Sequence, residues 1–529
     1  MVIELKRVFI SDEIDPRCVE VLKENGIEVV KDTKLRTDKE KFLAEISKYD
    51  GLIVRSATKV TADVINAATN LKIIGRAGTG VDNIDCDAAT KRGIIVMNTP
   101  GGNTLSAAEH TCALMCCLSR DIPNAVATMR AGTWDRKSFM GSELSGKTLA
   151  IIGLGRIGKE VALRMQSFGM TTIGYDPIIP GSVSAQFDTE WMELEKIWPL
   201  ADYITVHTPL IPQTRNLINE AVFAKCKKGV KVVNCARGGI IDEAALLKAL
   251  DAGQCGGAGL DVYVNEPPDD YTLAKHPKVI PTPHLGASTV EAQKRVAVEI
   301  AEQFVDVMHG RSLFGAINAH AMHNALSADT QPWVDLGRSL GSILARLGVD
   351  PKKGVSITSC GAGLKDAGSY LAASVLSGLL TDEGGAGDAA LNLVSAPAVA
   401  KQRGIQVESK YEVNKEAQYS QMVSVCADGR TLIGTTSGGQ ALLISINGAQ
   451  FSTPAVLSGS AILFQAKSDP KLLATVAGSL SSNGAVVTGV SVTVDSSGSQ
   501  WGLVYLPSPP PNGLFNISKT VQSAFELEF

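Results

Sequence analysis

One stretch of the chain decides the fold: LAIIGLGRIG, residues 149–158. An apolar run leads into a Gly-x-Gly-x-x-Gly turn that opens a helical pattern, which is the order of a dinucleotide-binding βα unit. Gly153 allows the tight turn, Gly155 lets the backbone approach a pyrophosphate, and Gly158 lets the helix pack closely on the strand. The free N–H groups at the start of the helix would then face the anion.

An acidic residue stands where such a fold needs one. Residues 171–175 have the pattern of the next strand and are followed by Asp176, about 20 residues past the turn. A carboxylate there accepts hydrogen bonds from ribose hydroxyls and would repel a 2′-phosphate, so the sequence predicts NAD as the cofactor. The alternative is a glycine-rich turn that binds nothing, and the order of strand, turn, helix, strand and acid argues against it.

Composition excludes several classes of protein. The 529 residues, 45% hydrophobic and 20% charged, suffice for roughly three or four domains. A net charge of −4 without long blocks of Lys and Arg argues against a nucleic-acid partner. The start of the chain lacks the pattern of a signal peptide, and no run approaches the roughly 18 apolar residues of a membrane span. We therefore expect a cytoplasmic protein without a membrane partner.

The ten cysteines are scattered and form no Cys-x-x-Cys pair. Cys112, Cys116 and Cys117 lie close together, but they fall on an apolar helical pattern. No histidine or second cysteine cluster stands at ligand spacing from them, so we expect buried, reduced thiols and no metal site.

Short β-rich runs alternate with helical patterns through the first 290 residues, which predicts an α/β protein with two doubly wound parallel sheets. The strands of the first sheet are expected at 7–10, 51–54, 71–74 and 93–96. The second, cofactor-binding sheet spans 99–287, with further strands at 203–206, 230–233, 259–262 and 279–280. A helical region from Thr104 to Arg130 precedes the glycine turn, and Pro123 must kink or end it.

Three polar residues follow successive strands of the second sheet: Arg237, Glu266 and His284. Open α/β sheets bind ligands at this carboxyl edge. Oxidation of a carbinol carbon requires proton transfer at its oxygen, which suits an imidazole oriented by a carboxylate, while an arginine binds a substrate carboxylate through two parallel hydrogen bonds. Each residue singly could be an ordinary loop side chain, but their joint placement favours a catalytic group.

These three residues and several surrounding motifs resemble those of the D-2-hydroxyacid dehydrogenases. The motifs that carry the resemblance are 76–85, the glycine turn, 234–243, 260–262 and 283–289. The resemblance implies that His284 is the acid–base group, Glu266 its partner and Arg237 the substrate clamp. It further implies NAD contacts from Thr79, Gly153, Gly155, Arg156, Ile157, Gly158, Asp176, Thr208, Cys235, Ala236, Arg237, Asp261, His284, Leu285, Gly286 and Ala287.

The family fold implies an NAD-binding Rossmann domain, 99–287, inserted in a flavodoxin-like substrate domain, 1–98 with 288–321, and a cleft between the two. Arg55 and Arg76 follow substrate-domain strands and are the expected phosphate ligands, with Gly78 and Asn103 as further substrate contacts. The basic pair Arg136-Lys137 is either a solvated loop or a contribution to a neighbouring subunit's site, since the family forms dimers.

The C-terminal part is expected to form α+β regulatory domains. Residues 322–455 would be an intervening domain, and 456–529 a small βαββα module closed by a helix over 517–525. This module resembles small-molecule-binding regulatory modules, but a role in oligomerisation alone is an equal alternative. All seven histidines lie at or before His323, so the chemistry belongs to the first part.

The length and the C-terminal extension look like the long members of the family. The resemblance implies NAD-dependent oxidation of 3-phospho-D-glycerate to 3-phosphonooxypyruvate, in serine biosynthesis, by a homodimer or homotetramer. The alternatives are another D-2-hydroxyacid dehydrogenase, such as a glyoxylate or hydroxypyruvate reductase, or an NAD-sensing corepressor scaffold of the same superfamily.

Overall fold

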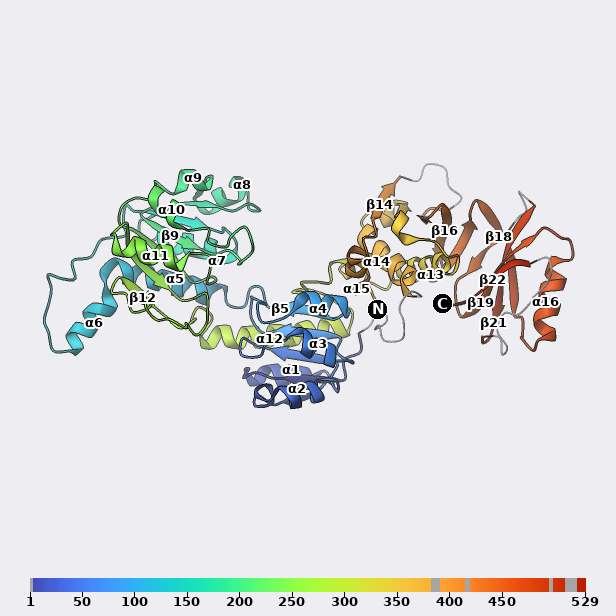
Figure 1. Cartoon of the computed structure of the whole chain (residues 1–529), viewed down its shortest axis with the longest axis horizontal. Coiled ribbons are helices and arrows are strands. Elements are labelled where there is room, and N and C mark those ends of the chain that lie inside the picture. The colour runs from blue at the N-terminus through green and yellow to red at the C-terminus, as the bar shows by residue number, and fades with distance from the viewer. Residues whose placement is uncertain (1–2, 382–390, 414–418, 494–497, 510–520) are drawn as a thin grey trace. The chain divides into compact units, whose positions relative to one another are not determined.

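The computed structural model describes residues 3–381, 391–413, 419–493, 498–509 and 521–529 (Figure 1). Two compact units divide the chain: Thr99–Ala297 forms one, and Met1–Asn98 with Val298–Phe529 forms the other. The first unit is therefore an insertion in the second. Among the described residues, no helix combines the length and apolar character needed to cross a membrane.

The inserted unit contains a seven-stranded sheet in the order β12-β11-β10-β9-β6-β7-β8, and all of its pairings are parallel. The strands are β6 (Thr148–Ile152), β7 (Thr171–Tyr175), β8 (Thr189–Trp191), β9 (Tyr203–Val206), β10 (Val230–Asn234), β11 (Cys255–Leu260) and β12 (Val279–Pro281). The direction of winding changes between β6 and β9, the point where doubly wound folds bind ligands. This confirms the expected fold class.

The side chains of β6 alternate between two apolar clusters, one on each face of the sheet. Ala150 and Ile152 belong to one apolar cluster, and Leu149 and Ile151 belong to another. Successive side chains of a strand point to opposite faces, so both faces of the sheet are covered. The layers include α5 (Thr104–Arg120), α7 (Arg156–Gln166), α8 (Gly181–Ser184), α9 (Leu194–Ile197), α10 (Glu220–Lys225) and α11 (Glu243–Asp251).

The helical region before the glycine turn is interrupted, as expected. Helix α5 ends at Arg120, Asp121 takes a left-handed conformation with φ 48°, and α6 (Ile122–Arg130) begins with Pro123 in its first turn. A proline is tolerated there because the first N–H groups of a helix have no partner within it.

The two ends of the inserted unit lie together. The hydroxyls of Ser106 and Thr289 are 2.7 Å apart, and Nε of Arg295 donates to the carbonyl of Gly102 over 3.0 Å. Helix α12 (Val290–Met308), which carries Arg295, then leads out of the unit.

The N-terminal part of the second unit is a five-stranded parallel sheet, order β2-β1-β3-β4-β5. Its strands are β1 (Arg7–Ile10), β2 (Glu28–Lys31), β3 (Gly51–Val54), β4 (Ile73–Arg76) and β5 (Ile95–Asn98), and its helices are α1 (Pro16–Glu24), α2 (Lys39–Ile46), α3 (Ala62–Ala67) and α4 (Cys86–Lys91). Phe304 of α12 packs on this sheet against Gly75. A Cβ added to Gly75 would lie only 2.5 Å from the Phe304 ring. Beyond α12, Ile317 N donates to Val96 O, so this segment extends the edge of β5.

A six-stranded sheet, order β14-β13-β15-β16-β17-β18, follows. Its strands are β13 (Val355–Cys360), β14 (Val407–Glu412), β15 (Met422–Ala427), β16 (Arg430–Ser437), β17 (Gln440–Ile446) and β18 (Ala449–Val456), with α13 (Gln331–Arg346), α14 (Gly368–Leu379) and α15 (Ser395–Gln402). Helices α13 and α14 touch closely at glycines, since a Cβ on Gly341 would lie 2.0 Å from Val375 O.

The last sheet corrects one expectation. It has the order β20-β21-β19-β22, built from β19 (Ser460–Lys467), β20 (Gly489–Val492), β21 (Ser499–Leu506) and β22 (Val521–Glu528), with helix α16 (Leu472–Ser482). The helix predicted over 517–525 is wrong: from Val521 the chain is a strand antiparallel to β19, and 517–520 lie outside the described residues. A short apolar run is compatible with the periodicity of either a helix or a strand. Here the hydrogen bonds to the open edge of β19 make it a strand.

Candidate active site

The glycine turn has the geometry that its motif predicts. Gly153 has φ +100°, and a Cβ there would lie 2.6 Å from the carbonyl oxygen of His207. A Cβ on Gly158 would lie 2.0 Å from Gly153 O, whereas one on Gly155 would meet nothing within 4 Å. Gly153 and Gly158 are thus required for packing, and Gly155 leaves open space above the start of α7, where Arg156 and Ile157 are the first residues.

Asp176 lies beside this turn. Its Oδ2 accepts a hydrogen bond from Leu154 N at 2.9 Å, and its Oδ1 accepts from Ile178 N at 2.8 Å and from Ile179 N. These backbone donors fix the carboxylate at the end of β7. An ionised carboxylate accepts up to about four hydrogen bonds, so capacity remains for ribose hydroxyls.

Thr208 follows β9 across the point where the winding changes. Among the residues that the structure describes, its Oγ1 is buried and has no hydrogen-bond partner. A Cβ added to Gly153 would lie 3.0 Å from Cγ2 of Thr208, so the Thr208 side chain packs against the glycine turn. A buried hydroxyl without a partner carries a desolvation cost that a polar ligand would relieve. The turn, Asp176 and Thr208 therefore fit a dinucleotide.

The loop after β10 carries three of the predicted residues, Cys235, Ala236 and Arg237. Asn234 shapes this loop, because its Oδ1 accepts from Ala236 N at 3.0 Å and its Nδ2 donates to Arg237 O at 2.8 Å. Burial raises the pKa of the Cys235 thiol to about 12, so the thiol is neutral. A neutral, buried thiol is unsuited to act as a nucleophile.

Asp261, at the end of β11, organises the loop that carries His284. Its buried carboxylate accepts from Thr282 Oγ1 at 2.6 Å, Leu285 N at 2.7 Å and Gly286 N at 2.8 Å. Burial raises the pKa of Asp261, but the hydrogen bonds outweigh burial and leave the pKa lowered. The backbone carbonyl of Asp261 also accepts from His284 N at 2.9 Å, and His284 takes a left-handed conformation with φ 54°.

His284 and Glu266 form a pair. Nδ1 of the ring lies 2.6 Å from Oε2 of Glu266, whose Oε1 accepts from Tyr263 N at 3.1 Å. An ionised carboxylate only accepts, so Nδ1 donates and Nε2 is left for exchange with a substrate. Burial raises the pKa of Glu266, but the hydrogen bond and charge of His284 prevail and lower it.

Two other histidines of this unit are unsuited to proton transfer at the same edge. Burial lowers the pKa of His207 to about 3, so this ring is neutral at physiological pH. Nε2 of His276 lies 3.4 Å from Oδ1 of Asp251, and His276 precedes β12, at the opposite end of the strand from His284. Geometry thus favours His284.

The predicted phosphate ligands lie in the other unit, at the ends of neighbouring strands β3 and β4. Asn83 joins them: its Oδ1 accepts from Nε of Arg76 at 3.0 Å, and its Nδ2 donates to the carbonyl of Arg55 at 2.7 Å. A Cβ on Gly78 would lie 2.7 Å from Nη1 of Arg76, so the glycine makes room for the guanidinium. Thr79 follows in the same loop, and its carbonyl accepts from Asn98 Nδ2.

Sequence reasoning missed Asn83 and also Asp12, whose Oδ2 accepts from Arg55 N at 2.6 Å. Their contacts with Arg55 span 28 positions for Asn83 and 43 for Asp12, so local spacing gives no signal for these contacts. Asn103 immediately precedes α5 in the inserted unit, so the structure does not bring it into the same compact unit as Arg55 and Arg76.

A doubly wound sheet with a phosphate turn, an acid after the next strand and a His–Glu pair at the same edge defines an NAD-dependent dehydrogenase. The family description "D-isomer specific 2-hydroxyacid dehydrogenase, NAD binding domain" matches residues 112–286, and "D-3-phosphoglycerate dehydrogenase intervening domain" matches 329–447. The chain belongs to the D-3-phosphoglycerate dehydrogenase family.

The curated relatives cover nearly the whole chain. The D-3-phosphoglycerate dehydrogenase of Sus scrofa is 48% identical over 99% of both chains, and that of Bacillus subtilis is 44% identical over 80% of this chain and 79% of its own. A solved D-lactate dehydrogenase from Aquifex aeolicus, complexed with NAD and lactic acid, matches with a TM-score of 0.54 and 27% identity. It covers 59% of this chain and 99% of its own.

Proposed function

We propose that the chain oxidises 3-phospho-D-glycerate to 3-phosphonooxypyruvate with NAD, the first step of the phosphorylated pathway of serine biosynthesis. The observation that carries the proposal is the 2.6 Å His284–Glu266 pair at the carboxyl edge of a sheet whose glycine turn and acid fit NAD. Relatives that match over almost the full length and are named for this activity support the choice of substrate.

The chain's own residues supply proton transfer and charge. Bound NAD would accept the hydride from C2 of the substrate. Nε2 of His284 takes the proton of the C2 hydroxyl, and Glu266 keeps the ring oriented and favours its protonated form. The guanidinium of Arg237 offers two parallel donors for the substrate carboxylate. Arg55 and Arg76 supply the positive charge for the phosphate, and Gly78 and Asn103 complete the proposed substrate contacts.

The proposed cofactor site follows the carboxyl edge of the sheet. The glycine turn and Arg156-Ile157 would hold the pyrophosphate, and Asp176 the adenosine ribose. The remaining proposed contacts are Thr79, Thr208, Cys235, Ala236, Asp261 and the 284–287 loop.

A second candidate is another D-2-hydroxyacid dehydrogenase. It is favoured by the solved structures that match the chain over about 60% of its length, which include a D-lactate dehydrogenase and a glyoxylate reductase. The match of the intervening-domain description to 329–447 argues for phosphoglycerate instead. Steady-state NADH formation from 3-phosphoglycerate, glycerate and D-lactate separates the two. A higher kcat/KM for either unphosphorylated acid would contradict our choice, and absence of turnover with all of them would favour the corepressor alternative.

We further propose that the enzyme is a cytoplasmic homodimer or homotetramer. Helix α6 and the segment after it present exposed apolar side chains, among them Met129 and Trp134 at 53% and 77% exposure. Clusters of this kind mark association surfaces. The exposed pair Arg136-Lys137 lies in the same segment and could then reach a second subunit's site. Light scattering of the wild type and of a Met129→Glu, Trp134→Glu variant tests the assembly, since the variant should dissociate.

A further inference from the structure

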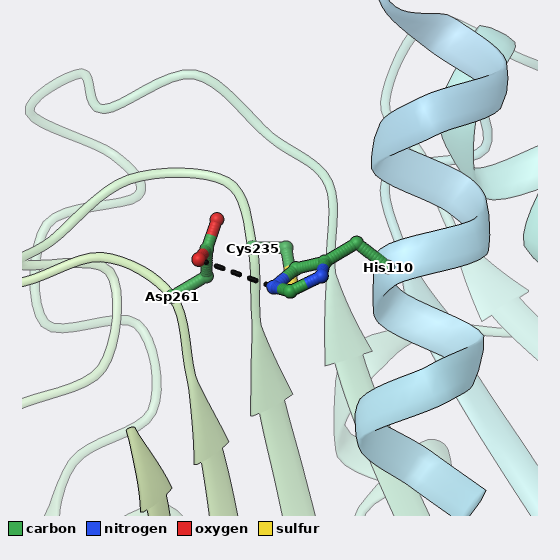
Figure 2. A group of neighbouring side chains, drawn as sticks. All are labelled: His110, Cys235 and Asp261. Carbon is green, nitrogen blue, oxygen red and sulfur yellow. Dashed lines mark hydrogen bonds and ion pairs between the residues drawn. The ribbon is translucent and has the colours of Figure 1, made fainter. Parts of the chain in front are cut away.

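A third histidine of the inserted unit, His110, lies against the loop that carries His284. Figure 2 shows His110 on α5 with its ring directed at Asp261. Nε2 of His110 lies 3.2 Å from Oδ1 of Asp261 and 3.1 Å from Oγ1 of Thr282. The Asp261 side chain is fully buried and that of His110 is 20% exposed, so solvent barely competes for this contact.

The direction of each hydrogen bond follows from the atoms available. The Thr282 hydroxyl has a single hydrogen and lies 2.6 Å from the carboxylate of Asp261, which only accepts. Thr282 therefore donates to Asp261, and its oxygen accepts from His110. Nε2 of His110 must then carry a hydrogen, which it shares between Asp261 and Thr282.

The same residues invite a metal interpretation, because ligand atoms of His110, Cys235 and Asp261 all lie within 4.8 Å of one another. Two observations argue against it. Burial raises the pKa of the Cys235 thiol to about 12, which disfavours a thiolate ligand. The Asp261 oxygens also accept from Thr282 and from the backbone of the loop, so a cation would have to displace these donors. The cluster is a hydrogen-bond network.

This network has a consequence for His284. A left-handed conformation is strained for a residue other than glycine and persists only where the surroundings fix it. Asp261 fixes it through the N–H groups of His284, Leu285 and Gly286. Thr282 lies two residues before His284 and is bonded to both Asp261 and His110, so His110 helps to fix the segment that leads into this turn.

We propose that His110 is a positioning residue for His284: by donating to Asp261 and Thr282 it keeps the acid–base ring in its reactive orientation. The inference rests on the proposed function only in taking His284 as the acid–base group. The ring of His110 bonds Asp261 and Thr282, whereas that of His284 bonds Glu266, and in this proposal His110 does not contact the substrate. Its loss should therefore slow the chemical step while substrate binding stays nearly intact.

Three variants of the full-length enzyme test this. His110→Met removes the donor at similar length and should lower kcat about fivefold to tenfold, the effect of one lost hydrogen bond, with the KM for 3-phosphoglycerate within about twofold. His110→Gln places an amide N–H near the position of Nε2 and should restore kcat to within about twofold of wild type. His276→Met is the matched control, since it removes a His–Asp contact of the same unit away from the loop, and kcat should not change.

A double-mutant cycle adds a readout that ordinary packing would not move. Thr282→Val should lower kcat at least as much, because it removes the bonds of Thr282 to both Asp261 and His110. The pair His110→Met, Thr282→Val should lose less than the product of the single losses, because the two residues share one of these bonds. If His110→Met does not fold, His110→Leu, which also lacks the donor, replaces it in both the single and the double variant.

Several results would overturn the inference. Unchanged kcat in His110→Met, equal losses in His110→Met and His110→Gln, or fully additive losses in the cycle would each show that His110 only fills space. Loss of wild-type activity in EDTA that Zn²⁺ reverses would show a metal site instead. If the wild type oxidises D-lactate and not phosphoglycerate, the proposed function fails, and the same comparison of variants with lactate still tests His110.

Discussion

Oε2 of Glu266 lies 2.6 Å from Nδ1 of His284, and the two residues come from the loops that follow neighbouring strands β11 and β12. The contact occupies one ring nitrogen with an anion and leaves the other for the substrate. The ring remains 47% exposed, so a substrate can approach it.

His284→Ala removes the group that takes the hydroxyl proton. We expect turnover to fall by roughly 10²- to 10⁴-fold, the usual contribution of a positioned general base. NAD affinity, measured by calorimetry, should change little because the glycine turn and Asp176 are untouched. A variant that keeps full activity would remove His284 from the mechanism.

Glu266→Gln keeps the shape of the pair and removes its charge. Turnover should fall, and the acid limb of the pH profile of kcat/KM should move to lower pH, because the carboxylate no longer favours the imidazolium form. Since the folded-state pKa of Glu266 is lowered, its contribution to stability is present above the unfolded pKa and is lost as pH falls through the folded pKa. Unfolding curves of wild type and variant should thus converge in acid, and an unmoved acid limb would contradict the pairing.

Asp176 should set the choice of cofactor. The wild type is expected to prefer NAD strongly over NADP, because the carboxylate repels a 2′-phosphate. Asp176→Asn and Asp176→Ala should both lower the ratio of kcat/KM with NAD to kcat/KM with NADP. The asparagine variant should be the more stable of the two, because it keeps an acceptor for the backbone N–H groups. Equal use of both cofactors by the wild type would show that Asp176 does not face the ribose.

Arg55 and Arg76 should matter for the phosphate. Replacing either with alanine should raise the KM for phosphoglycerate roughly tenfold to a hundredfold, from the loss of a charge-assisted contact of roughly 1.5–3 kcal/mol. The KM for glycerate should change far less. Arg17→Ala is the control, since Arg17 pairs with Glu20 and Glu24 on the exposed face of α1. Equal effects on both substrates would assign the arginines to the carboxylate or to the fold.

The C-terminal sheets should be dispensable for the chemistry. A chain ending at Ala321 keeps Asn318, whose Nδ2 donates to Ile94 O at 2.9 Å and whose Oδ1 accepts from Val96 N. It should fold and oxidise phosphoglycerate within about tenfold of the full rate, a barrier change of about 1.4 kcal/mol, with a smaller subunit number. Steady-state assays and light scattering test both parts. A folded but inactive truncated chain would mean that the removed part acts on the active site.

Features that depend on the spacing of residues close together in the chain could be predicted from the sequence. The glycine turn needs small residues within six positions and an acid after the next strand, and the structure places Gly153, Gly155, Gly158 and Asp176 together as this motif requires. Arg237, Glu266 and His284 could be selected as candidates from the sequence because each follows a strand, and strands β10, β11 and β12 are neighbours in the sheet.

Features that depend on distant partners could not be predicted. Asn83 reaches Arg55 across 28 positions, and His110 reaches Asp261 across 151, so no periodicity reveals either contact. Strand β2 was missed because it lies at the edge of its sheet and begins and ends with charged residues. The helix predicted at the C-terminus failed for the related reason that pairing with β19, far earlier in the chain, sets the conformation.

The hydrogen bonds that join the beginning and end of the inserted unit, Ser106 with Thr289 and Gly102 with Arg295, make it a segment whose two ends are already close in space. Such a segment can be exchanged between chains as one piece, because a host needs to offer only two neighbouring attachment points. Transplanting residues 99–297 into the matching position of a related dehydrogenase should therefore carry the cofactor preference of this protein into the recipient, while selectivity among hydroxy acids stays with the host.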